Sequence, residues 1–321
     1  WRKQLSVGVP VSLLILGAGA ELLGIFAVLK KNSVPILLAA IAIQRVAEDG
    51  NIYPALPREQ FYPRVPLIEA IPREPLYRFA AIDSMVVPNV GSMYGLEDVR
   101  GYAAMTSIPY QRTLPLWCPD ARRTWHDIQD LSRPFLNFLG VKYALTPRSM
   151  EPPPGWRVLA DDRGSRLVEN ANAIPRVFVP RHLTYLDDDD AALEQMRGAN
   201  DFADNAWIST RAVPPHVERN GEATLATNRA GTARYEIDVD ARGPTRIVIT
   251  ESNWPGWRAY IDGRRVNAEP ANLAFLSVHV PAGRHRVRVV YRPDAYVRGR
   301  AISIATAVLL AIGFTLRMRR R

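Results

Sequence analysis

The stretch 251–293 constrains the fold more than any other part of the chain. Segments rich in β-branched and aromatic residues alternate with turn residues around it, at 245–250, 257–261, 275–280 and 286–292. Asp262-Gly263 supplies the positive φ angles that a tight hairpin turn requires. Pro281-Ala282-Gly283 is predicted to close the next hairpin. The stretch therefore predicts a compact run of β-hairpins.

An apolar segment follows this β-rich stretch directly. Residues 301–316 are uncharged, and with Tyr296 and Val297, and with Arg298 and Arg300 snorkelling, the segment reaches about 20 residues, enough to span a bilayer. The chain ends in Arg317-Met318-Arg319-Arg320-Arg321, whose arginines outnumber those on the other flank. The positive-inside rule then predicts a cytoplasmic C-terminus and a large extracytoplasmic domain.

The N-terminal part contains two more apolar segments. Residues 5–29 are apolar apart from Ser6, Ser12 and Glu21, and are long enough to span a bilayer. Residues 34–43 form a shorter run that either crosses with a tilt or lies in the interface. We expect transmembrane helices in 1–46, one full and one short. The start without Met and the short second run predict the C-terminal piece of a larger multi-pass membrane protein.

The basic charge of the chain belongs to these membrane flanks. The net charge is +9, to which residues 1–31 contribute +3 and residues 298–321 contribute +6, so that 32–297 is balanced. A nucleic-acid-binding protein concentrates its basic residues on a folded face. The distribution therefore predicts the lipid bilayer, and no nucleic acid, as a partner.

The region between the apolar segments divides into two predicted domains. Prolines from Pro54 to Pro75 predict a linker, and 47–212 then mixes short helices (66–71, 135–139, 191–196) with short strands (77–82, 141–146, 156–159, 166–169, 176–179). From residue 213 the pattern is all-β, with Tyr235, Ile237 and Val239 alternating with acidic residues. The predicted fold class is membrane-anchored α+β: a mixed α/β ectodomain (47–212), then an antiparallel β-sandwich (213–293), flanked by transmembrane helices, the last at 294–321 with a cytoplasmic basic tail.

The chain carries few signatures of catalysis or of cofactor binding. Cys118 is the only cysteine, which excludes an intramolecular disulfide and a zinc cluster of cysteines. The glycine-rich nucleotide motifs, G-x-S-x-G and H-E-x-x-H are absent from the sequence. The acidic run 187–190 is typical of a solvated helix N-terminus. We therefore predict no cofactor, no metal site and no catalytic residue in this chain.

Two groups of residues are candidates for ligand binding. Exposed aromatic rings stack on sugar faces and an amide bonds hydroxyl groups, so one predicted glycan platform consists of Trp254, Trp257, Tyr260 and Asn272. The alternative is that Trp254-Pro255-Gly256-Trp257 packs into the hydrophobic core at a corner of the sandwich. The glycine-punctuated loop 89–102 supplies the second group, Asp98, Arg100 and Tyr102, which either contact a substrate or form a buried ion pair within the loop.

Several motifs together resemble one protein family. They are Trp254-Pro255-Gly256-Trp257-Arg258-Ala259-Tyr260-Ile261-Asp262-Gly263, Ala271-Asn272-Leu273-Ala274-Phe275, Val280-Pro281-Ala282-Gly283-Arg284-His285 and Tyr291-Arg292-Pro293, with Asp98-Val99-Arg100-Gly101-Tyr102, Leu139-Gly140-Val141-Lys142-Tyr143-Ala144-Leu145-Thr146 and Pro175-Arg176-Val177-Phe178-Val179 upstream. In these motifs the chain resembles the YfhO-type bacterial membrane protein family.

The resemblance implies a function and a place for its chemistry. YfhO-type proteins resemble GT-C-type glycosyltransferases, which move a sugar from a polyprenyl-phosphate carrier onto a cell-surface glycopolymer. In that fold the catalytic acid belongs to early extracytoplasmic loops among N-terminal spans, which this chain does not contain. The resemblance thus implies a module for acceptor binding or positioning, with a cell-surface glycan or a polyprenyl-linked sugar as partner. The alternative is a non-catalytic structural or interaction ectodomain.

Overall fold

The computed structural model describes residues 62–101, 106–119, 126–162, 164–229 and 231–319, together with 19, 38, 39 and 41–43. Most of the two N-terminal apolar segments, with Glu21, lies outside these residues. The chain divides into two compact units, Trp1–Arg64 and Val65–Arg321. The second unit contains nearly all of the described residues, and its architecture is as follows.

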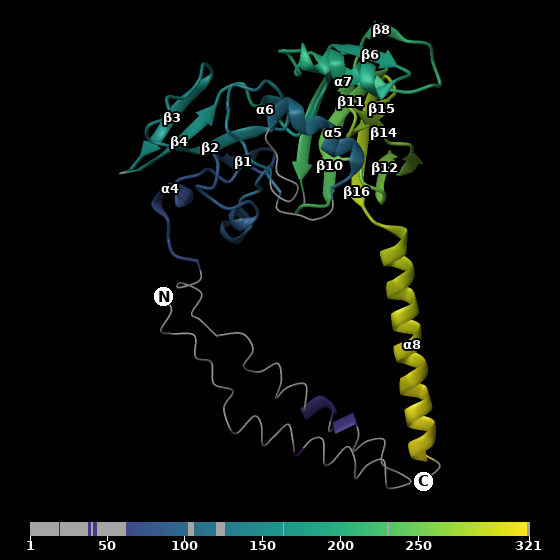
Figure 1. The fold of residues 1–321 in the computed structure, drawn as a ribbon. Coiled ribbons are helices and arrows are strands. Elements are labelled where there is room, and N and C mark those ends of the chain that lie inside the picture. The colour runs from purple at the N-terminus through teal and green to yellow at the C-terminus, as the bar shows by residue number, and fades with distance from the viewer. Residues whose placement is uncertain are drawn as a thin grey trace. The chain divides into compact units, whose positions relative to one another are not determined.

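A mixed sheet opens the second unit (Figure 1). Its order is β1 (Arg78–Ala81), β2 (Val141–Pro147), β4 (Ser165–Asn170) and β3 (Trp156–Asp161). Strands β1 and β2 are parallel, and the other pairs are antiparallel. The short helix α4 (Pro66–Glu69) buries Leu67 and Ile68 in a core shared with Phe79 and Tyr143.

A β-sandwich forms the centre of the unit. One sheet has the order β13 (Arg264–Val266), β12 (Trp257–Ile261), β16 (Gly283–Tyr291), β10 (Arg234–Ala241) and β9 (Ala223–Arg229). The other has the order β14 (Glu269–Ala271), β15 (Phe275–Val280), β11 (Thr245–Ser252) and β5 (Val177–Phe178). Ile237 and Val287 of the first sheet share a core with Ile249 and Val278 of the second. The alternation predicted for Tyr235, Ile237 and Val239 is confirmed, since all three are buried.

Helices and a small sheet cover the outer face of the second sandwich sheet. They are α5 (Ile108–Trp117), α6 (Phe135–Phe138), α7 (Asp189–Arg197), and the strands β7 (Asn205–Ser209), β6 (His182–Leu186) and β8 (His216–Arg219). The 3-10 helix η1 (Val90–Tyr94) lies instead against the mixed sheet, where Gly91 is close to Phe79. Phe138 packs edge-on against Phe275, with ring centroids 4.8 Å apart. Strand β11 is therefore buried on both faces: Ile249 points into the sandwich and Val248 into the helix-covered core.

Helix α5 was not predicted from the sequence because it contains two prolines. Pro109 stands in its first turn and Pro115 inside it, and both disguise the helical pattern. The Ser107 side chain caps its N-terminus by accepting a hydrogen bond from the Tyr110 N–H, at 3.4 Å.

The predicted run of hairpins is confirmed in one place and wrong in another. Strands β12 and β13 form a hairpin through Asp262 and Gly263, whose φ angles are 49° and 81°. Pro281-Ala282-Gly283, in contrast, carries the chain from one sandwich sheet to the other, because β15 and β16 lie in different sheets. The alternating pattern indicates which face of a strand is buried, and the pairing partner has to be found elsewhere in the chain.

Helix α8 (Asp294–Arg319) begins three residues after β16 ends. Its part Asp294–Gly313 is long and apolar enough to cross a membrane, by length and composition. The predicted division near residue 212 stays a prediction, and strands from both sides of it pair, since β5 adds to the edge of β11.

Gly256 gives a testable account of the corner between the sandwich and α8. Its φ is 125°, and an added Cβ would lie 3.0 Å from the Cα of Pro293 and 3.0 Å from the Tyr291 ring. We expect Gly256→Ala to lower the free energy of unfolding by about 2 kcal/mol or more, since strained backbone costs about 1–3 kcal/mol. Denaturant titration against Gly243→Ala, where a Cβ meets no described atom within 4 Å, provides the comparison. Equal stability of the two variants would contradict this account.

Candidate functional site

Charged side chains meet in a group that we call the ionic junction: Arg78, Arg176, Arg229, Glu97 and Glu251. Arg176 donates to Glu251 at 2.8 Å and also bonds Glu97, while its own side chain is 1 % exposed. Arg229 donates to Glu97 through both terminal nitrogens, one of them at 2.9 Å. Arg78 lies 3.6 Å from Glu251. Three arginines thus form ion pairs with the two carboxylates of Glu97 and Glu251.

The ionic junction joins the mixed sheet to the sandwich. Arg78 begins β1, and its guanidinium donates to the Thr250 carbonyl at 2.6 Å and to the Leu139 carbonyl at 2.7 Å. Backbone bonds run alongside: the Arg176 N–H donates to the Leu76 carbonyl at 3.0 Å, and the Thr250 N–H to the Arg176 carbonyl at 2.8 Å. Residues that are far apart in the sequence are therefore held together by charge and by the backbone.

Burial and the neighbouring arginines have opposite effects on the pKa of Glu97 in the ionic junction. Burial raises the pKa of Glu97, but the hydrogen bond from Arg229 and the charges of Arg176 and Arg229 outweigh it, so that this pKa lies below its ordinary value. Burial, and next the charge of Arg176, lower the pKa of Arg78. Tyr235 donates to Glu251, and burial together with that carboxylate raises its pKa. The Glu97 carboxylate is therefore ionised near neutral pH.

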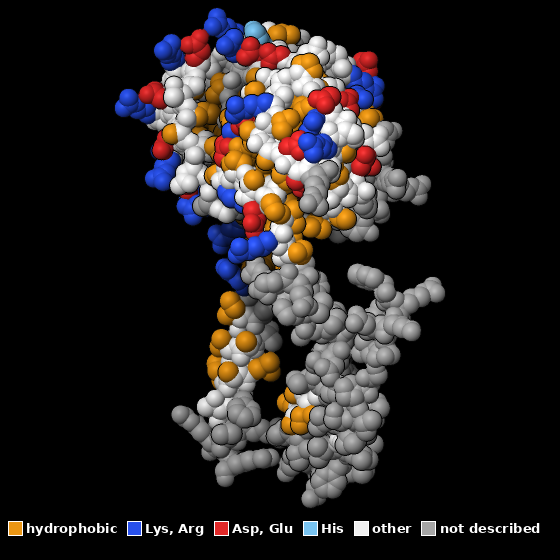
Figure 2. All heavy atoms as spheres, turned by 90° about the vertical axis from the view of Figure 1, so that its left-hand side faces the viewer, with side chains coloured by type: hydrophobic (Ala, Val, Ile, Leu, Met, Phe, Trp, Pro, Cys, Tyr) orange, Lys and Arg blue, Asp and Glu red, His pale blue; other side chains and the backbone are white. Residues whose placement is uncertain are grey.

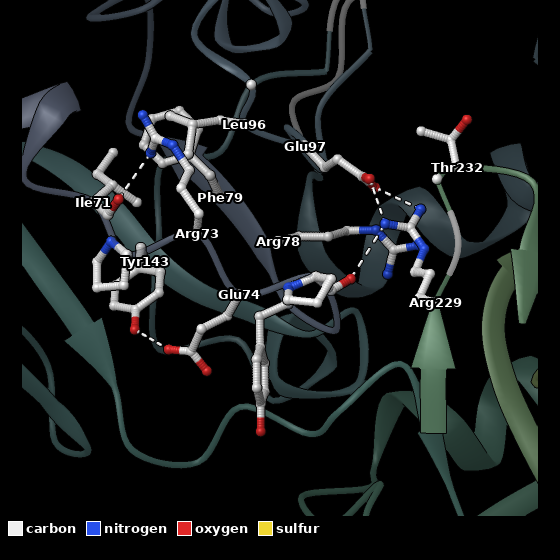
Figure 3. Close-up of a pocket in the computed structure, with 15 residues that line it drawn as sticks. Ile71, Arg73, Glu74, Arg78, Phe79, Leu96, Glu97, Tyr143, Arg229 and Thr232 are labelled. Carbon is white, nitrogen blue, oxygen red and sulfur yellow. Dashed lines mark hydrogen bonds and ion pairs between the residues drawn. The ribbon is translucent and has the colours of Figure 1, made fainter. Parts of the chain in front are cut away.

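A cleft of about 280 Å³ opens beside the ionic junction (Figure 3). Arg73, Phe79 and Tyr143 lie on one side of the close-up, and Arg229 and Thr232 on the other, with Glu97 between them. Tyr143 bonds Glu74, which Lys142 also approaches at 2.8 Å.

A second cavity, of about 320 Å³, brings several of the predicted site residues together. Asp98, Arg100 and Trp254 line it, with unpredicted residues between them: Val99, Gly101, Thr106, Ser107, Tyr110, His126 and Ser252. Trp254 is 43 % exposed. The Gly101 N–H donates to Nδ1 of His126 at 3.2 Å, so this nitrogen is unprotonated, and burial lowers the pKa of His126. We call this space the Trp254 cavity.

Asp98 and Arg100 form the buried ion pair that was one of their two predicted roles. Arg100 donates to both Asp98 oxygens, at 3.1 and 2.8 Å, and to the carbonyls of Asp83 and Val86. The two side chains are 3 % and 0 % exposed. Four of the five N–H groups of the Arg100 guanidinium are thus bonded, and the pair shapes the wall of the Trp254 cavity.

The other predicted residues lie apart from one another. Trp257 is half-buried and packs on Tyr291, with ring centroids 5.3 Å apart. Tyr260 alternates with buried Ala259 and Ile261, and the Arg288 guanidinium lies 4.5 Å from the centre of its ring. Asn272 is fully buried and accepts a hydrogen bond from the Trp207 N–H at 2.9 Å, while Tyr102 lies outside the described residues. Trp254, Trp257, Tyr260 and Asn272 therefore share no single platform.

The sequence reasoning missed Glu97, Glu251 and the arginines between them. A weak signal was present, because Glu251 directly follows the buried residues 245–250 within β11, and Arg176 precedes another buried strand. A charge at such a place requires a buried partner. The partner itself is not readable from the sequence, since Arg176 and Glu251 are 75 residues apart.

On the face in view, basic side chains gather at the base of the folded region (Figure 2). Basic and acidic side chains alternate over the rest of the folded region, whereas apolar side chains cover the described part of α8. Ile302, Leu309 and Leu310 of this helix are each more than 60 % exposed. Among the described residues, no group of three or more His, Cys, Asp or Glu side chains is placed to hold a metal ion.

These features define a class of protein: a β-sandwich, joined to a mixed sheet, whose chain continues into a helix able to cross a membrane. Residues 213–303 match the family model described as Bacterial membrane protein YfhO. The resemblance predicted from the motifs is thereby confirmed over the sandwich and the start of α8, and it supports association with a lipid bilayer. Comparisons with curated proteins and with solved structures gave no match.

Removing a charge from the ionic junction should destabilise the protein more than removing a charge from its surface. Glu251→Gln leaves the arginines with one carboxylate, and we expect it to lower the free energy of unfolding by about 3–5 kcal/mol, the cost of breaking a buried ion pair. Glu222→Gln is the control, because this side chain is 59 % exposed and pairs only with surface arginines. Unfolding in denaturant measures both variants. A loss for Glu251→Gln no larger than that for Glu222→Gln would show that the ionic junction contributes little.

Proposed function

We propose that residues 65–293 form the extracytoplasmic, glycan-binding module of a multi-pass bacterial membrane protein related to polyprenyl-phosphate-sugar-dependent glycosyltransferases. Its role is to bind or position the acceptor glycan. The observation that carries the proposal is the Trp254 cavity, where an exposed indole stands among hydroxyl groups beside the start of α8.

The chemistry of the Trp254 cavity suits a neutral sugar. An indole face stacks on the C–H face of a pyranose, while Thr106, Ser107 and Ser252 offer hydroxyl groups that both donate and accept hydrogen bonds. The only charged side chains in its lining, Asp98 and Arg100, satisfy one another. This balance favours a ligand rich in hydroxyl groups over an ionic one.

The position of the cavity suits a substrate at a membrane surface. Two residues beyond Trp254, the Gly256 carbonyl accepts a hydrogen bond from the Arg292 N–H at 2.7 Å, immediately before α8. If Asp294–Gly313 spans the bilayer, Trp254 lies close to the headgroup region. A sugar carried on a lipid phosphate, or a glycan at the outer surface, is then within reach.

A non-catalytic scaffolding role is the alternative, and one observation favours it. The Asp98–Arg100 pair and Asn272 are buried and bonded within the chain, so these residues of the matching motifs stabilise the fold. Under this alternative the Trp254 cavity binds no glycan.

Trp254 allows the two roles to be separated. On an array of bacterial envelope oligosaccharides, the full chain in detergent is expected to bind at least one glycan. Trp254→Ala should weaken that binding about tenfold or more, which equals about 1.4 kcal/mol, and Trp254→Phe should retain part of it. Tyr260→Ala tests the separate aromatic residue on β12 and should leave affinity unchanged. Absence of glycan binding by the unaltered chain would favour the scaffold.

The lowered pKa of His126 allows the pH dependence of glycan binding to be predicted. Burial lowers its pKa below the ordinary 6.5, so folding favours the neutral ring, and this contribution to stability is lost as the pH falls from about 6.5 through the folded value. Protonation also places an N–H opposite the Gly101 N–H in the cavity wall. Tyr110 stays protonated, because burial raises its pKa to about 12.

We therefore expect glycan affinity to be constant from pH 7 to 8 and to fall several-fold as the pH drops below about 6. Titration of glycan binding at constant ionic strength checks this expectation. His126→Gln, which does not titrate, is the control and should remove the pH dependence. A profile that is the same for both proteins would exclude His126 as its cause.

A further inference from the structure

The cleft beside the ionic junction carries more positive than negative charge. Three arginines of the junction share two carboxylates. Lys142 balances Glu74 at the other wall. Arg73 donates only to the carbonyls of Ile71 and Ile68 among the described residues, at 2.8 and 3.4 Å. The charged groups in and behind the cleft therefore leave an excess of two cations.

Arg229 also has, beside the cleft, a buried donor without a partner in the described part of the chain. Its side chain lines the cleft and is 4 % exposed, yet its Nε has no hydrogen-bond partner among the described residues. A buried donor without a partner costs about 1–3 kcal/mol. A bound anion in the cleft would offset the excess positive charge around this side chain.

The walls of the cleft indicate a small ligand that is partly apolar. Ile71, Phe79, Leu96 and Tyr143 line one side, where a carbon skeleton can pack, and Arg229 and Thr232 face them (Figure 3). The volume of about 280 Å³ lies just below the range of small-molecule sites, which begins near 300 Å³, so only a small ligand fits. Arginine bonds planar carboxylates and tetrahedral phosphates through paired N–H groups.

We propose that this cleft binds the oxyanion of a small organic ligand, a phosphate ester or a carboxylate, between Arg73 and Arg229. The oxyanion lies beside the edge of the ionic junction, and the carbon skeleton packs on Phe79 and Tyr143. This anion cleft shares no lining residue with the Trp254 cavity. The proposal is therefore independent of the proposed glycan site.

Arg73 provides the cleanest test, because it is exposed and takes no part in the ionic junction. Calorimetry on the full chain, in a detergent without phosphate or carboxylate, uses inorganic phosphate, glucose 6-phosphate and glucuronate at matched ionic strength. We expect millimolar or tighter binding of at least one probe. Arg73→Gln should weaken this binding about fivefold to tenfold. Arg157→Gln, whose side chain is 72 % exposed on β3, is the control and should change nothing.

Each outcome decides the proposal. Binding of the two phosphates alone, or of glucuronate alone, supports it and names the oxyanion. Arg229→Gln should abolish binding if it folds; if it does not fold, protection of the unaltered chain against heat by the same probe replaces it. Absence of binding with every probe overturns the proposal. Equal affinity in Arg73→Gln and Arg157→Gln overturns it too, since the anion then binds elsewhere.

Discussion

Two shared carboxylates hold the described fold together. Glu97 and Glu251 bond three arginines that arrive from β1, from the start of β5 and from the end of β9. The Arg176 and Arg229 side chains are 1 % and 4 % exposed, and charges buried this deeply destabilise a protein unless they are paired with good geometry. Pairing is possible only when the mixed sheet and both sheets of the sandwich are in place. The ionic junction therefore couples the folding of these sheets, together with the β5–β11 pairing and the apolar core that also join residues on both sides of position 212.

The ionic junction also separates the two cavities. Glu97 lines the anion cleft, and the next residue, Asp98, lines the Trp254 cavity. The backbone of this segment pairs with β1, as the Phe79 N–H donates to the Glu97 carbonyl at 2.9 Å. A single segment with alternating side chains thus forms the wall of both spaces. One space has paired charges and hydroxyl groups, and the other has excess arginine, so the two proposed ligands differ in chemistry although their sites are neighbours.

Features that depend on neighbouring residues could be predicted from the sequence, whereas contacts between residues far apart in the chain could not. Strands β10, β12 and β15 were readable because alternation has a period of two, and the Asp262-Gly263 turn because its backbone requirement is local. The pairing of β5 with β11 and the crossing between β15 and β16 depend on residues far away. Asp98 and Arg100 were identified as a possible pair because they are two residues apart. Trp254, Trp257 and Tyr260 were grouped because they are close in sequence, but the corner at Gly256 and the alternation of β12 place them in different surroundings.

Native-state hydrogen exchange on the full chain, in increasing denaturant at pH 7, tests the central claim most directly. If the ionic junction couples the sheets, the slowest amides of β1, β5 and β11 open with one common free energy, because these strands unfold as one unit. The account predicts that their exchange curves merge before global unfolding. Exchange of β1 at much lower denaturant, while β11 stays protected, would show that the mixed sheet and the sandwich are independent and would contradict the account.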